Sequence, residues 1–164
     1  MLGKIIREAL ISPCGRYRYR LTRRWDDLPL LPFVMLNPST ANEYEDDPTI
    51  RRCMGFARRE GLGGITVANM YGLRATNPGD LLRANDPFGP ENDRALYELA
   101  FQAVVNRVPI VCAWGARGSR SNHHMRSFWQ AGAKLKLVCL GKTTDGHPRH
   151  PLYVKADQPL EVFR

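Results

Sequence analysis

The chain has 164 residues, of which 43% are hydrophobic and 24% are charged, and its formal net charge is +8. This composition excludes a disordered chain, the lack of a long apolar stretch excludes a membrane helix, and the length predicts a single domain over residues 1–164. Charged residues at positions 1–10, where a signal peptide is apolar, favour a cytoplasmic protein without a membrane partner, and the basic charge favours a polyanionic partner.

Basic residues are concentrated near the N-terminus, and over residues 16–21 they alternate with apolar ones. The alternating sets are Arg16, Arg18 and Arg20 on one side and Tyr17, Tyr19 and Leu21 on the other. This alternation predicts a half-buried edge strand or hairpin with a basic, solvated outer face. Residues 25–47 then contain acids but no Lys or Arg, which predicts a carboxylate-lined site within a basic surface.

The apolar run Phe33–Leu36 predicts a strand that is buried on both faces, as in a parallel sheet. Pro38 favours an extended backbone at Asn37, so the Asn37 amide is expected to project past the carboxyl end of the strand. Ligands of open α/β sheets bind beyond that end, which makes Asn37 and Ser39 candidate site residues. The ordinary alternative is a turn in which these side chains bind the backbone.

A helix is expected to begin at Pro48 and to stop at Gly61, because Asp47 fits its N-cap and apolar residues recur at helical spacing. One cap requires one carboxylate. The neighbouring Asp46 is therefore left for another role.

Strands and helices continue to alternate along the rest of the chain. We expect a strand at 65–71, an irregular loop at 73–90, a helix at 91–106 with Val104 on its buried face, a strand at 108–114, a short helix at 121–132 and a strand at 135–140. This order predicts a three-layer α/β/α protein with a central four-stranded, mostly parallel sheet. Parallel strands share a carboxyl edge, so the polar residues after the four strands would meet there: Asn37, Asn69, Trp114 with Arg117, and His150.

The cysteines are scattered, with no paired spacing: Cys14, Cys53, Cys112 and Cys139. This pattern is typical of small buried apolar residues rather than of a zinc site or a disulfide framework. We expect neither a metal nor a cofactor.

The order of these motifs resembles the uracil-DNA glycosylase superfamily. Leu36-Asn37-Pro38 is similar to the Asn-Pro turn of its mismatch-type branch, and Gly64–Asn69 is similar to its second motif. Ala113-Trp114-Gly115 resembles the end of its third strand, and His150-Pro151-Leu152 resembles its His-Pro loop. The resemblance implies a base-excising hydrolase of DNA or nucleotides. The catalytic Asp and Tyr of the main uracil-excising branch are absent from the first turn, so the resemblance does not identify which base is excised.

A second resemblance covers almost the whole chain, to an uncharacterised bacterial and phage domain family of unknown function. It is carried by Tyr17-Arg18-Tyr19, by residues 36–41, by residues 46–49 and by residues 146–153. This resemblance implies no activity.

The glycosylase resemblance implies a role for each candidate residue. Asn37 would position the attacking water, with Asp46 or Asp47 as the polarising carboxylate. His150 would stabilise the departing base anion, although His147 competes with it for the His-Pro role. The expected substrate contacts are Pro38, Ser39, Asn69, Tyr71, Leu152 and Tyr153, with Phe88 as an alternative stacking residue. The expected phosphate contacts are Arg117, Arg120, Arg126 and Arg149.

Two other functions fit the sequence. One is a non-catalytic nucleic-acid-binding module with the same fold, and the other is a metal-dependent phosphodiesterase that uses Glu43, Asp46 and Asp47. His150 and Asn69 also have ordinary alternatives, a hydrogen bond to the backbone and a strand-end turn. We expect a monomer that prefers DNA to RNA.

Overall fold

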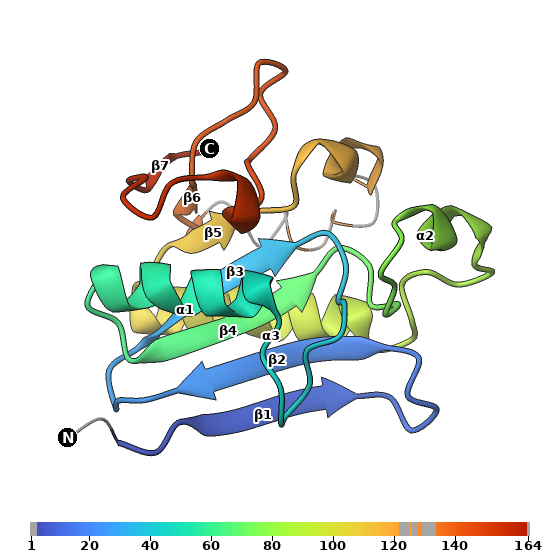
Figure 1. Ribbon diagram of the computed structural model, residues 1–164, viewed down its shortest axis with the longest axis horizontal. Coiled ribbons are helices and arrows are strands. Elements are labelled where there is room, and N and C mark those ends of the chain that lie inside the picture. Colours follow the sequence, from blue (N-terminus) through green and yellow to red (C-terminus); the bar gives the residue numbers. More distant parts are fainter. Residues whose placement is uncertain (1–2, 122–124, 126–127, 129–133, 164) are drawn as a thin grey trace.

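A seven-stranded sheet forms the centre of the computed structural model, which describes residues 3–121, 125, 128 and 134–163 (Figure 1). The strands are β1 (Ile6–Ile11), β2 (Arg18–Arg24), β3 (Leu30–Met35), β4 (Gly64–Asn69), β5 (Ile110–Cys112), β6 (Leu137–Cys139) and β7 (Glu161–Val162). The helices are α1 (Pro48–Arg59), α2 (Gly79–Arg83) and α3 (Asn92–Asn106), with 3₁₀ turns η1 (Ala116–Ser121) and η3 (Pro151–Tyr153).

The strand order is β1-β2-β4-β3-β5-β6-β7. The neighbours β4–β3, β3–β5 and β5–β6 run parallel, whereas β1–β2, β2–β4 and β6–β7 run antiparallel. The α/β class is therefore confirmed, but the prediction of a four-stranded sheet is wrong. Strand β1 was anticipated only as the partner strand of a possible hairpin, without bounds, and β7 escaped prediction because it has only two residues.

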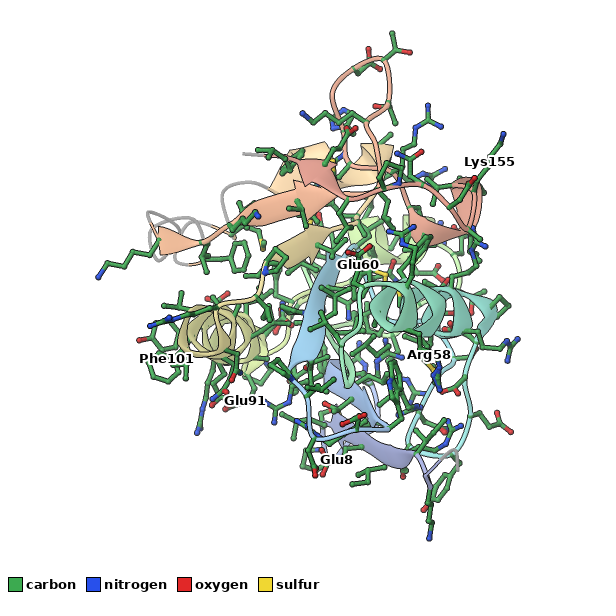
Figure 2. The ribbon with its side chains drawn as sticks, turned by 90° about the vertical axis from the view of Figure 1, so that its left-hand side faces the viewer. Glu8, Arg58, Glu60, Glu91, Phe101 and Lys155 are labelled. Carbon is green, nitrogen blue, oxygen red and sulfur yellow. The ribbon has the colours of Figure 1, made fainter. Side chains whose placement is uncertain are left out.

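Helices α1 and α3 cover opposite faces of the sheet, as Figure 2 shows from the side, with Phe101 on the outer side of α3. The period-two alternation of β3 explains this arrangement. Phe33 and Met35 pack with α1, whereas Val34 between them packs with α3. Both faces of β3 are thus buried, as its uninterrupted apolar sequence predicts.

Strand β2 differs from its predicted form in place and in side-chain direction. It lies between β1 and β4, so the hairpin alternative is confirmed and β1 forms the edge. The pairing with β1 shifts by one residue, because Leu10 faces Arg20 and Ile11 faces Arg18. This bulge breaks the alternation, and Arg18 does not share the side of Arg20. The prediction of a solvated arginine row is wrong for Arg18, which is buried. Arg23, further along β2 and outside that row, is also fully buried.

The predicted helix boundaries agree closely with the structure. Asp47 caps α1 by accepting a hydrogen bond from the Ile50 backbone N–H at 2.8 Å, and Gly61 follows the helix with a φ of 72°. The α3 helix is confirmed, but Val104 is 41% exposed rather than buried. The expected irregular loop at 73–90 contains the short α2, and most of the helix expected at 121–132 lies outside the described residues.

Candidate functional site

A cavity of about 700 Å³ opens where β3 and β5 end, beside the first turn of α1. Ligand sites of small molecules commonly have this size. The lining includes many of the residues predicted from the sequence: Asn37, Ser39, Asp47, Trp114, Arg117, Arg149, His150, Leu152 and Tyr153. The segments after β3, β5 and β6 therefore meet at one cavity, as expected for the shared carboxyl edge of parallel strands.

The Asn37 side chain is held by its amide nitrogen. Nδ2 donates to the backbone oxygen of Ala75 at 2.7 Å and to that of Pro38 at 3.0 Å. Both donors of the amide are thus used, which leaves Oδ1 as an acceptor with no partner among the described residues. An amide oxygen fixed in this way can accept a hydrogen bond from a ligand or from water in the cavity.

The two neighbouring acids have different environments. Asp46 accepts from Nε of the buried Arg23 and from Nη1 of Arg7, each at 2.7 Å, and it does not line the cavity. Asp47 lines the cavity, and its Oδ1 accepts the capping bond from Ile50 N–H. Within the described part of the chain, Oδ2 of Asp47 has no hydrogen-bond partner. The carboxylate of the site is therefore Asp47, and Asp46 is committed to the ion pairs.

His150 is the N-cap of η3 and lines the same cavity. Its Nδ1 accepts a hydrogen bond from the Leu152 backbone N–H at 3.2 Å, which places the proton of a neutral imidazole on Nε2. Burial lowers the pKa of His150, and the negative charge of Asp47 opposes this effect. His150 is thus a neutral Nε2–H donor near pH 7. Beside it, the side chains of Leu152 and Tyr153 are exposed at the cavity.

Arg18 also lines the cavity, although it was not among the predicted site residues. Its Nη1 donates to the backbone oxygen of Ala41 at 2.7 Å, and its buried Nε has no partner among the described residues. Burial lowers the pKa of Arg18 to about 10, against the opposing charge of Asp47, so the guanidinium remains charged at pH 7. The alternating arginines at positions 16, 18 and 20 were the only sequence signal for this residue. In a strand without a bulge, that alternation places Arg18 on the same face as Arg20, away from the cavity.

Four of the predicted substrate contacts lie away from this cavity. Pro38 is buried but does not line it, and Tyr71 lines a second cavity of about 430 Å³, where it stacks on Phe88 at a ring distance of 5.0 Å. Asn69 is fully buried, and neither polar atom of its side chain has a partner among the described residues. It pairs in register with Met35, which lines the cavity, so Asn69 lies one strand away from the cavity wall.

Two predicted phosphate contacts cannot be placed. Arg126 lies outside the described residues, and so does the side chain of Arg120. The remaining two, Arg117 and Arg149, are exposed and line the cavity.

The acidic residues do not form a metal site in the described part of the chain. No group of three or more His, Cys, Asp or Glu side chains lies close enough there to hold a metal ion. Glu43 does not line the cavity, and Asp46 is occupied by Arg7 and Arg23. The phosphodiesterase alternative therefore has no clustered ligand set among these residues.

A family model described as "Protein of unknown function (DUF1643)" matches residues 18–152. No curated protein and no solved structure matches the chain. Within the described residues, no helix is both long enough and apolar enough to cross a membrane.

Proposed function

The chain belongs to the DUF1643 family of proteins of unknown function, and we propose that it hydrolyses the N-glycosidic bond of a nucleotide, either free or within DNA. The observation that supports this proposal is the meeting of three side chains at one cavity: Asn37 and Asp47 from the connection between β3 and α1, and His150 from the segment before η3, which is distant in the sequence. An acceptor for water, a carboxylate and a neutral donor are the groups that this reaction requires.

In the reaction, the oxygen of water bonds to C1′ of the sugar as the bond from C1′ to the base nitrogen breaks. The base leaves with the electron pair, and the sugar passes through a state with oxocarbenium character. One proton of the water is lost, and the base finally gains one. The site must therefore hold the water, accept its proton and stabilise a negative base.

Asn37 and Asp47 act on the water in this proposal. The free Oδ1 of Asn37 accepts a hydrogen bond from it, and the amide cannot swing away because Ala75 and Pro38 hold Nδ2. The free Oδ2 of Asp47 accepts the proton. The fixed negative charge of Asp47 also stabilises the positive sugar.

His150 acts on the base. A neutral imidazole whose Nδ1 is bound to Leu152 N–H presents Nε2–H to an oxygen or nitrogen of the departing base. A donor fixed in place before the reaction stabilises developing charge without the cost of reorganisation. Exposed Leu152 and Tyr153 supply apolar surface for a base next to this donor.

The experiment is a search for free base by mass spectrometry. The protein is incubated with single-stranded and duplex DNA and with free nucleotides, each set carrying normal and modified bases. Asn37→Ala and His150→Ala are expected to slow base release by about 10²- to 10³-fold, as does the loss of one charge-stabilising donor in other enzymes. His147→Ala is the matched control, since His147 lies in the same loop but does not line the cavity.

Each outcome separates the alternatives. Base release that depends on Asn37 and His150, but not on His147, supports the proposal. If a broad panel yields no free base while the protein binds DNA with a steep salt dependence, the non-catalytic binding module replaces it. Loss of activity in a chelator would favour metal-dependent chemistry instead.

A further inference from the structure

The β-bulge in β2 determines the position of Arg18. Arg20, on one side of the bulge, forms an ion pair with Glu98 of α3 at 3.4 Å. Arg18, on the other side, donates to Ala41, which packs with the residues of α1. Bulges often redirect a side chain at a functional site. Here the bulge moves one guanidinium from the α3 face of the sheet to the wall of the cavity.

The Arg18 guanidinium is buried and makes no ion pair in the described part of the chain, although the charge of Asp47 stabilises it from beyond ion-pair distance. It is 2% exposed, and no carboxylate of the described residues lies within ion-pair distance of it. Its only hydrogen bond in this part of the chain goes to the neutral Ala41 carbonyl, and its Nε–H is unpaired. A buried charge of this kind destabilises the folded protein unless another group pairs with it and satisfies its hydrogen bonds. The cavity that Arg18 lines is the place from which such a group can come.

The charges around the cavity indicate what that group is. Three guanidinium groups line the cavity, those of Arg18, Arg117 and Arg149, against the single carboxylate of Asp47. His150 is neutral near pH 7 because burial lowers its pKa. The lining is therefore positive, which favours a ligand with a negative group. Arginine forms short, strong bonds with phosphate through its fork of N–H donors.

We propose that Arg18 binds the phosphate monoester of a free nucleotide, which makes the substrate a nucleoside monophosphate rather than an internal residue of DNA. This inference rests on the proposed function, which supplies the nucleotide, and it deepens that function by choosing between polymer and free nucleotide. Arg18 is accessible only from within the cavity, so a phosphate that binds to it must enter the cavity as well. A terminal phosphate can do so, whereas an internal phosphodiester has chain on both sides.

Binding measurements test this assignment without requiring turnover. Isothermal titration compares 2′-deoxynucleoside 5′-monophosphates with the matching nucleosides, and inorganic phosphate is titrated alone. The intact protein is expected to bind the monophosphate at least tenfold more tightly than the nucleoside, as for a hydrogen bond to a charged group. Arg18→Met is expected to remove this preference, and Arg18→Lys to keep part of it.

Arg20→Met is the matched control, because it removes an equal charge from the same strand on the other face. It is expected to leave the preference for the monophosphate unchanged. Thermal unfolding separates binding from a structural role: Arg18→Met removes an unpaired buried charge, so its unfolding temperature should stay the same or rise. A fall in unfolding temperature, with equal loss of nucleoside and monophosphate affinity, would show that Arg18 only holds the Ala41 segment.

The two proposals fail in different ways. If DNA strands release base while Arg18→Met binds monophosphates as the original protein does, the proposed function stands and the role of Arg18 is wrong. If monophosphates bind through Arg18 but no base is released from any substrate, the phosphate site stands and the glycosidic chemistry is wrong.

Discussion

Arg18 and Arg20 lie two positions apart on β2, yet their side chains bind partners on opposite faces of the sheet. Arg18 donates to Ala41 on the α1 face, and Arg20 pairs with Glu98 on the α3 face. In a regular strand, residues two positions apart share a face. The bulge opposite Leu10 and Ile11 is therefore a feature of the site, because it brings Arg18 to the cavity.

Arg23 and Arg20 are expected to differ strongly in their effect on stability. Arg23 is fully buried, and its Nε–H bonds Asp46, so Arg23→Met removes one partner of a largely buried ion pair. Such changes cost roughly 3 kcal/mol of unfolding free energy. Arg20→Met removes only an exposed pair at 3.4 Å and should cost about 0.5 kcal/mol or less. Urea unfolding of both variants measures the two costs, and equal costs would contradict this expectation.

Asp46 is expected to make stability depend on pH in the acid range. Burial raises the pKa of Asp46, but the hydrogen bonds and charges of Arg23 and Arg7 outweigh it, so the pKa lies below its ordinary value. The unfolded chain then binds the proton more tightly than the folded protein. The stabilisation is complete above about pH 5, where an ordinary Asp is fully ionised, and is lost as the pH falls through the folded pKa.

Asp46→Asn tests this dependence. Its unfolding free energy should be lower than that of the original protein at pH 7, and the difference between the two proteins should shrink as the pH falls from about 5 to about 2. Urea unfolding across this range measures the difference, and a constant difference would contradict the prediction.

Local signals in the sequence were sufficient to predict the secondary-structure elements that surround the site. Asp47 before Pro48 and Gly61 after the apolar repeat define α1 without tertiary information, because capping and termination are local effects. Asn37 was identified because it follows an apolar run, and parallel strands end at a common edge, whereas His150 was identified because His150-Pro151-Leu152 resembles a His-Pro loop.

The features that the sequence did not predict depend on how distant segments pack against one another. The bulge at Arg18 arises from its pairing with β1, so an alternating pattern alone could not reveal it. Asn69 ends β4 and Asn37 follows β3, yet Asn69 is fully buried and does not line the cavity. Val104 matched the helical repeat, but its side chain is 41% exposed.

Two glycines are expected to respond in opposite ways to alanine. A Cβ on Gly118 would lie 2.0 Å from Cδ1 of Trp114, so Gly118→Ala must move an indole that lines the cavity. Overpacking of this kind costs about 1–3 kcal/mol. Gly55 lies on the exposed side of α1, where an added methyl group would have no atom within 4 Å, and Gly55→Ala should stabilise the helix by about 0.5–1 kcal/mol. Thermal unfolding checks both signs, and near-ultraviolet circular dichroism reports the displacement of Trp114.

His150 is expected to titrate below its ordinary pKa of about 6.5, because burial disfavours the imidazolium. Its Nδ1 accepts a hydrogen bond from Leu152 N–H. Protonation of Nδ1 would replace this hydrogen bond with a repulsive contact between two N–H donors. The unfolded chain therefore binds this proton first, and the stability contributed by neutral His150 declines from about pH 6.5 down to the folded pKa. The ring-proton shifts of His150 in NMR spectra, followed against pH, measure that folded pKa.

Asp47 provides the test of this electrostatic relationship, since its charge raises the pKa of His150 against the effect of burial. Asp47→Asn should lower the pKa of His150 further, whereas Asp46→Asn should leave it unchanged, because Asp46 is paired with Arg7 and Arg23. The same NMR titration in the two variants gives the answer. A shift of equal size in both would mean that overall charge, and not the shared cavity, couples Asp47 to His150. A shift confined to Asp47→Asn would show that the carboxylate and the imidazole interact directly within one cavity, as the proposed hydrolysis requires.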